Sequence, residues 1–186
     1  SETRFDDQLD ALRRFQQLEL LRIGCSDLFG FSSLPIVVAQ LSNLAIALVR
    51  ACLMISKESL KAEPSGFAVI ALGKLGGREL NYSSDIDLIF IARSTDVVFQ
   101  RLGRKLIDAL SRTTACGFLY RVDMRLRPWG GVGRLAPSLE EALSYFKDQA
   151  RIWEKQALVK ARMIAGDDEL GVGFLRKMRP EIYALE

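Results

Sequence analysis

The sequence predicts an α+β fold, in which helices flank a small sheet and a helical appendage precedes it. Two stretches within residues 1–62 repeat apolar side chains at helical spacing. Beyond a turn-rich break, three short apolar runs typical of strands alternate with helical patterns and glycine-rich loops. We therefore expect an N-terminal helical segment over residues 1–62, packed on a core over residues 63–186 that ends in helices.

Two helices are expected in the appendage. The first is predicted to end near Gly24, and Ser32 or Ser33 is placed to cap the second, with Pro35 in its first turn. Each helix carries an apolar stripe, which we expect to be core rather than functional. The stripes comprise Leu9, Leu12, Phe15, Leu18 and Leu21 in the first helix, and Val37, Leu41, Leu44, Leu48, Cys52 and Ile55 in the second.

An uncharged run over residues 28–49 is long enough to raise the question of a membrane span. It includes a proline, a glycine and several polar residues, and its strongly apolar positions recur at helical spacing, which favours an amphipathic helix of a soluble protein. The N-terminal residues are polar and acidic, unlike a secretory leader. We therefore expect a cytoplasmic protein with no membrane partner.

The composition excludes several kinds of chemistry. The 186 residues include no histidine, so Ser-His-Asp catalysis, Cys-His catalysis and histidine-containing metal sites are excluded within this chain. The three cysteines, Cys25, Cys52 and Cys116, lie far apart, and we expect buried, reduced thiols rather than a disulfide framework. A net charge of +3 is too small to indicate a nucleic-acid partner.

The core is expected to begin with a buried strand over residues 67–72. A loop or short helical turn over residues 73–84 leads to a second strand over residues 85–92. Apolar residues at helical spacing then predict a helix over residues 98–114, and a third strand is expected over residues 118–126.

The last part of the chain is expected to be mainly helical. After a glycine-rich loop, Ser138 and Glu141 form a capping box that opens a helix reaching residue 157, with Trp153 on its buried stripe. Residues 157–164 fit either a further strand or a continuation of that helix. A turn at residues 166–168 precedes a last short helix.

The sharpest local motif is Asp85-Ile86-Asp87-Leu88. Alternate residues of a strand share a face, so Asp85 and Asp87 are expected to point the same way, with backbones roughly 7 Å apart. Such a pair repels strongly at close approach and is costly on a strand unless a cation neutralises it. The alternative is a solvated edge strand with chance acidic residues, which the apolar flanking residues disfavour.

Two further segments carry residues suited to phosphate chemistry. On the third strand, Arg121, Asp123 and Arg125 would share one face, where guanidinium groups match phosphate oxygens; a structural ladder of arginine and aspartate is the alternative. After the first strand, the segment from Leu72 to Gly77 (LGKLGG) is rich in glycine, which lets backbone amides approach a phosphate. It lacks the order of a P-loop, and alone it would be an ordinary turn.

Together these motifs resemble the nucleotidyltransferase superfamily built on a DNA polymerase beta-like core, a short mixed sheet with flanking helices. Its signature places a hydrophobic-Gly-Gly/Ser turn about ten residues before Asp-hydrophobic-Asp. Lys74 stands where that pattern usually has serine or glycine. A closer family includes this lysine: residues 73–90 (GKLGGRELNYSSDIDLIF), 120–128 (YRVDMRLRP) and 153–162 (WEKQALVKAR) resemble bacterial glutamine synthetase adenylyltransferase/adenylyl-removing enzymes.

This resemblance implies a Mg²⁺-dependent nucleotidyltransferase that controls glutamine synthetase by reversible adenylylation. Proteins of that family carry two such domains, one that transfers AMP from ATP to a tyrosine and one that removes it by phosphorolysis to give ADP. The segment RVDMRLRPWG at residues 121–130, with GDDELG at 166–171 and PEIY at 180–183, resembles the removing domain, whereas the transferring domain tends to have Arg-Pro-Ser-Gly. The connection over residues 92–99 is shorter than the variable segment typical of the family.

The resemblance also implies roles for individual residues. Asp85, Asp87 and Asp123 would be catalytic and would hold one or two Mg²⁺ ions. ATP, ADP and phosphate would be substrates or products, and glutamine synthetase would be the partner, with a nitrogen-signalling regulatory protein acting through the full-length enzyme. The residues expected to bind phosphate or nucleotide are Gly73, Lys74, Gly76, Gly77, Ser84, Arg125 and Arg127, although the two arginines could instead orient Asp123. Lys160 and Arg162 are further candidates that could instead be structural or partner-facing.

Three alternatives stay open. The chain could be the AMP-transferring domain of the same enzyme. It could be a nucleotidyltransferase that acts on an antibiotic, on another protein or on RNA, although its arginines are too dispersed for the basic stripe that RNA requires. It could also be a non-catalytic nucleotide-binding domain that regulates a partner, which the presence of all three carboxylates disfavours.

Overall fold

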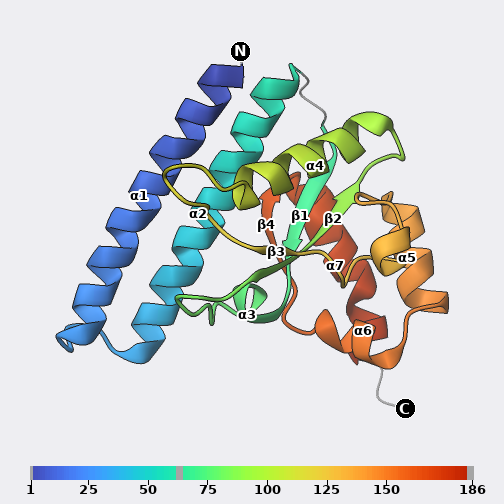
Figure 1. Ribbon diagram of the computed structural model, residues 1–186. Helices are drawn as coiled ribbons and strands as arrows, with labels where there is room; N and C mark the ends of the chain where they lie inside the picture. The colour runs from blue at the N-terminus through green and yellow to red at the C-terminus, as the bar shows by residue number, and fades with distance from the viewer. Residues whose placement is uncertain (1, 62–64, 184–186) are drawn as a thin grey trace.

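The computed structural model describes residues 2–61 and 65–183 and has the predicted α+β architecture, with helices around a small central sheet (Figure 1). The expected boundary between residues 62 and 63 lies outside the described residues. In chain order the elements are α1 (Glu2–Leu28), α2 (Leu34–Leu60), β1 (Phe67–Ala71), α3 (Gly73–Gly76), β2 (Ile86–Ala92), α4 (Val97–Ser111), β3 (Val122–Asp123), the 3-10 turn η1 (Gly130–Val132), α5 (Leu139–Asp148), α6 (Ile152–Ala157), β4 (Arg162–Gly166) and α7 (Asp168–Tyr183).

The four strands form one mixed sheet in the order β3-β2-β1-β4. Strand β1 pairs antiparallel with both β2 and β4, and β2 pairs in parallel with β3. The strands β1 and β2 are buried almost throughout, as their continuous apolar runs predict. The predicted mixed sheet is therefore confirmed.

Helices cover both faces of the sheet, and each face has its own apolar core. Alternate residues of β1, such as Val69 and Ile70, point into opposite cores. The first core joins β1 and β2 to α1, α2 and α4, whereas the second joins them to α5 and α7. Figure 1 shows the α1–α2 hairpin on one side of the strands and α5, α6 and α7 on the other.

The stripe predicted for the first helix is wrong in most of its members. Leu9 is buried and Leu12 half-buried, but Leu18 and Leu21 are 66% and 64% exposed and Phe15 is 49% exposed. Helix α1 also extends to Leu28 rather than ending near Gly24. Its buried face instead includes polar side chains, which an apolar pattern does not reveal.

Arg13 is the main polar anchor of that buried face. Its side chain is fully buried, with Nη1 donating to Asp10 at 2.8 Å and Nη2 donating to the Arg112 carbonyl at 2.8 Å. Thr114 Oγ1 also donates to Asp10, at 2.8 Å. The hydrogen bonds from Thr114 and Arg13 lower the pKa of Asp10 below its usual value. These bonds join α1 to the chain that follows α4.

Helix α2 contains residues 34–49 of the uncharged run and is long and apolar enough to cross a membrane by length and composition alone. Half of its most apolar stretch, 50%, is buried within the fold. It packs on α1, α4 and β4, which is how a core helix behaves. Ser33 stands at its N-cap position with Pro35 in the first turn, as predicted, although the serine side chain makes no capping hydrogen bond.

Three predicted elements are wrong in length. The expected strand over residues 118–126 is reduced to Val122–Asp123. The helix opened by the capping box ends at Asp148, and α6 follows as a separate helix after a break. The last helix is not short, since α7 has 16 residues. Of the two interpretations of residues 157–164, a strand is correct, but it occupies Arg162–Gly166.

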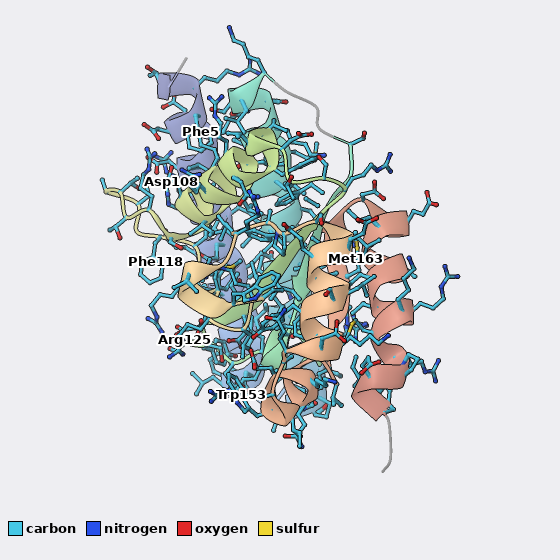
Figure 2. All side chains as sticks on the ribbon, turned by 90° about the vertical axis from the view of Figure 1, so that its right-hand side faces the viewer. Phe5, Asp108, Phe118, Arg125, Trp153 and Met163 are labelled. Carbon is cyan, nitrogen blue, oxygen red and sulfur yellow. The ribbon has the colours of Figure 1, made fainter. Side chains whose placement is uncertain are left out.

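Two side-chain predictions are also wrong. Trp153 lies on α6 and is 53% exposed, near one end of the molecule (Figure 2), because the break before α6 turns it away from the stripe of α5. All three cysteines are free, but only Cys52 is buried, with Cys116 half-buried and Cys25 exposed. Burial raises the pKa of the Cys52 thiol to about 12.

Candidate functional site

The parallel pairing of β2 and β3 brings the three predicted carboxylates together. Asp87 is the register partner of Asp123, and Asp85 lies two residues before Asp87, immediately ahead of β2. The intervening Ile86 and the following Leu88 are fully buried, as the alternation predicted. Three acidic side chains thus meet at the end of the sheet where β2 begins.

Arginines from the chain around β3 pair with two of these carboxylates. Arg121 Nε donates to Asp85 Oδ1 at 2.6 Å. Arg125 donates to Asp123 through Nε at 2.8 Å and through its backbone amide, also at 2.8 Å. The side-chain hydrogen bond from Arg125 lowers the pKa of Asp123, so this carboxylate stays ionised.

Asp87 has a different environment from its two neighbours. It is half-buried, and the pKa of its carboxyl is raised, first by burial and then by the charges of Asp123 and Asp85. Arg125 and Lys74 act in the opposite direction without cancelling the effect. Burial and the two neighbouring carboxylates together therefore disfavour the ionised form of Asp87.

The turn after β1 lies directly against Asp87. The Leu72 amide donates to the Asp87 carbonyl at 2.9 Å, which holds the turn beside β2. Gly73 has a φ of +52°, and a Cβ at this position would come within 2.6 Å of Asp87 Oδ2. Lys74 Nζ lies 3.5 Å from Ser84 Oγ. Glycine is required here both by the left-handed backbone and by the contact with the carboxylate.

Beside these carboxylates lies an open pocket of about 530 Å³, which we call the carboxylate pocket; Asp123 and Arg125 are not among its described lining residues. Of the predicted residues it brings together Asp85, Asp87, Gly73, Lys74 and Ser84. Sequence reasoning missed Asn81 and Ser83 as lining residues. The strand alternation placed Arg121 on the same face as Asp123, but Arg121 was not assigned to the site. That shared face was the sequence signal that could have identified it. Among the described residues, the lining consists of Gly73, Lys74, Asn81, Ser83, Ser84, Asp85, Asp87 and Arg121.

Gly76 is the last residue of the short helix α3 and Gly77 is its C-cap, and neither lines this pocket. Their amides donate to the carbonyls of Leu72 at 2.9 Å and Gly73 at 3.1 Å, so both are already used within the turn. A Cβ on Gly76 would lie 2.3 Å from the Lys160 carbonyl oxygen. These two glycines therefore allow close packing of α3 against the chain before β4.

The remaining cationic residues predicted for the site, Lys160, Arg162 and Arg127, form hydrogen bonds and an ion pair near the pocket. Lys160 Nζ pairs with Glu79 at 2.7 Å, and Arg162 Nε donates to the Gly76 carbonyl at 2.9 Å. Arg127 donates to the Met124 carbonyl at 2.9 Å, while its buried Nε has no hydrogen-bond partner among the described residues. None of these three side chains lines the carboxylate pocket.

The donor set suits a hard cation. Within residues 2–61 and 65–183 no ready-made group of three or more ligating side chains surrounds a metal position. Carboxylate and hydroxyl oxygens are nevertheless the protein ligands that Mg²⁺ prefers. The raised pKa of Asp87 arises partly from crowded negative charge, which a bound cation would neutralise. In donor chemistry and charge, therefore, the residues fit Mg²⁺.

The family model and the relatives that match this chain indicate the same protein family. The family model described as glutamate-ammonia ligase adenylyltransferase matches residues 1–177. The chain is 40% identical over 195 residues to the bifunctional glutamine synthetase adenylyltransferase/adenylyl-removing enzyme of Nitrosococcus oceani, covering 92% of this chain and 20% of that protein. It is also 40% identical over 195 residues, with the same coverage, to the enzyme of that name from Pseudomonas aeruginosa. The chain thus spans about a fifth of the length of these relatives.

Proposed function

The chain belongs to the glutamate-ammonia ligase adenylyltransferase family, and on that premise we propose that it removes AMP from a tyrosine of glutamine synthetase. The reaction is a phosphorolysis, in which adenylylated tyrosine and phosphate give ADP and free tyrosine. The target would be glutamine synthetase in the cytoplasm, and a nitrogen-signalling regulatory protein would act through the longer enzyme. Neither nucleic acid nor a membrane has a part in this function.

One observation carries the proposal: Asp87 and Asp123 are register partners across β2 and β3, beside a turn that contains Gly73 and Lys74. Displacement at phosphorus needs positive charge on the phosphate and a fixed in-line geometry. Lys74 and Arg121 line the same pocket as Asp85 and Asp87, so cations and carboxylates surround one space. This arrangement supports phosphoryl chemistry better than simple nucleotide binding.

In this proposal Asp85, Asp87 and Asp123 would hold one or two Mg²⁺ ions, which would supply positive charge to the reacting phosphate groups. Lys74 and the backbone at Gly73 contact phosphate oxygens. Arg125 orients Asp123 through hydrogen bonds from its backbone amide and its guanidinium, and Arg127 supports the same segment through the Met124 carbonyl. An oxygen of phosphate attacks the AMP phosphorus, the bond to the tyrosine oxygen breaks, and tyrosinate leaves and takes up a proton.

The direction of the reaction is supported by the segment after Asp123. The sequence there contains Arg127-Pro128-Trp129-Gly130, the form that resembles the removing domain. Trp129 has a φ of +57°, its indole nitrogen donates to Gln149 at 3.0 Å, and its ring lies 4.8 Å from that of Tyr145. A serine could make none of the ring contacts that join this segment to α5. In this proposal the helical segment comprises residues 1–62, and the nucleotidyltransferase core comprises residues 63–186.

A paired assay with Mg²⁺ tests both the family activity and its direction. One reaction contains the chain, adenylylated glutamine synthetase and phosphate, and the other contains unmodified glutamine synthetase and ATP. We expect ADP release in the first reaction alone. Incorporation of AMP in the second reaction alone would instead make the chain the transferring domain. If both reactions are silent while circular dichroism shows an intact fold, this chain lacks activity of its own and the proposal fails for it.

Substitution of the carboxylates tests the proposed site. Asp87→Asn should abolish ADP release, because it removes one of the charges that hold the cation, while the melting temperature stays near that of the unchanged chain. Asp168→Asn, on the exposed first turn of α7, is the matched control and should leave the rate unchanged. Near-normal turnover in Asp87→Asn would refute the assignment of the site.

A further inference from the structure

A second pocket opens beside the carboxylate pocket, between α1 and the loops that precede β2 and β3. It has a volume of about 330 Å³ and shares Asn81, Ser83, Ser84 and Arg121 with the carboxylate pocket. None of the described residues that line it is acidic. A ligand whose charged end lies at the carboxylates could therefore extend an uncharged part into this second space.

The walls of this pocket are apolar and come from distant parts of the chain. Leu20 and Leu41 reach it from α1 and α2, Leu80 comes from the loop before β2, and Phe118 comes from the loop before β3. Leu80 is buried, whereas Phe118 is 41% exposed although it is large and aromatic. Flat apolar walls of this kind suit an aromatic ring.

Two glutamine side chains add fixed polar groups. Gln16 Nε2 donates to the Leu119 carbonyl at 2.7 Å, and Gln17 Nε2 donates to the Cys116 carbonyl at 3.0 Å. Because the Gln17 nitrogen is held by a backbone carbonyl, its amide oxygen is left to accept a hydrogen bond from a ligand, whereas the Gln16 amide also hydrogen-bonds the Tyr120 side chain. An exocyclic amine on an aromatic ring is the matching donor.

The loop between the two pockets is held on the α1–α2 hairpin. Tyr82 Oη donates to Asp27 at 2.9 Å, and the Leu80 amide donates to Ser42 Oγ at 3.1 Å. Residues 80–84 thus have one contact with each helix of the hairpin, which fixes the second pocket relative to Asp85 and Asp87. A preformed pocket limits the ordering that a ligand must impose when it binds.

We propose that this pocket receives the adenine ring of the nucleotide whose phosphate lies in the carboxylate pocket. The inference rests on the function proposed above, and it applies to both directions of that reaction because AMP-tyrosine, ADP and ATP share the adenosine group. It also gives the α1–α2 hairpin a direct role, since Gln16, Gln17, Leu20 and Leu41 form one side of the adenine site.

Calorimetric titration with ADP and with pyrophosphate, each with Mg²⁺, tests the assignment, because only ADP has an adenine ring. Leu20→Trp should fill the pocket and weaken ADP binding roughly tenfold or more, with pyrophosphate affinity changed by less than about twofold. Leu18→Trp is the matched control, since Leu18 is 66% exposed on the same helix and lies outside the pocket, and it should change neither affinity. Phe118→Ala removes one wall instead and should also weaken ADP alone.

Three other results of these titrations would overturn the adenine assignment. If the unchanged chain binds pyrophosphate and ADP, but Leu20→Trp and Phe118→Ala bind ADP as it does, the adenine assignment is overturned and the proposed function stands. An equal loss for both ligands would also overturn it, because the effect would then lie on the phosphate side. If the unchanged chain binds neither ligand, the proposed function and this inference fall together.

Discussion

Gly73 offers a direct test of how the turn after β1 controls the carboxylate pocket. In Gly73→Ala the new Cβ would lie 2.6 Å from Asp87 Oδ2, closer than the 3.0 Å below which such contacts essentially never occur. The carboxylate must therefore move by at least 0.4 Å, and by 0.8 Å to reach an ordinary contact at 3.4 Å. A misplacement of about 1 Å at a reacting group can cost about 100-fold in rate. We expect ADP release to fall by roughly 10-fold to 100-fold.

The same substitution has a cost in stability that must be separated from the effect on rate. A left-handed backbone costs a non-glycine residue about 1–2 kcal/mol. Gly30→Ala is the matched control, because Gly30 has a φ of +71° but no atom within 4 Å of the added Cβ. Both variants should lose similar free energy of unfolding in urea titrations, whereas only Gly73→Ala should lose turnover. Equal rates in the two variants would refute the role of Gly73 in positioning Asp87.

Further predictions concern packing, thiol reactivity and acid stability. Gly76→Ala should lower the free energy of unfolding by about 1–3 kcal/mol, because its Cβ meets backbone atoms that cannot move away, whereas Gly24→Ala in α1, with open space around it, should raise it by up to about 1 kcal/mol. A maleimide should label exposed Cys25 in the native chain and leave buried Cys52 unmodified until the chain unfolds, as peptide mass spectrometry would show. The folded-state pKa of Asp10 is lowered from 3.8, so the stabilising effect of this carboxylate is complete above pH 3.8 and is lost as the pH falls through the lowered pKa. Asp10→Asn should therefore reduce the dependence of the urea midpoint on acid pH. An unchanged dependence would contradict this prediction.

The strand pattern predicted the centre of the site because it depends on simple alternation. Asp85 and Asp87 are two residues apart on a strand with buried neighbours, so their shared face follows from local geometry. The pairing of Asp87 with Asp123 depends on a parallel contact between distant segments, which the family resemblance implied and the local pattern of residues did not. The pairing of Arg125 with Asp123 follows from their shared face, whereas the pairing of Arg121 with Asp85 joins two distant segments and could not be assigned from local spacing.

The errors have a common physical origin in tertiary contacts. Arg13 belongs to the buried face of α1 because Asp10 and the distant Arg112 carbonyl each accept a hydrogen bond from its guanidinium. Exposed apolar residues such as Leu18 and Leu21 then occupy the opposite side of the helix. The spacing of apolar residues predicts which of them face the core, but it cannot identify a buried arginine whose hydrogen-bond partner is distant in the sequence.

The very short pairing between β2 and β3 bears on how the site opens. Strand β2 is central in the sheet, whereas the third carboxylate lies on an edge strand of only two residues. Local opening that breaks so few ladder bonds requires far less free energy than global unfolding. Amide hydrogen exchange around Asp123 should therefore be fast relative to that of β1, and a ligand that bridges Asp87 and Asp123 should slow it. A bound ligand would then stabilise the pairing of β2 with β3 against this local opening.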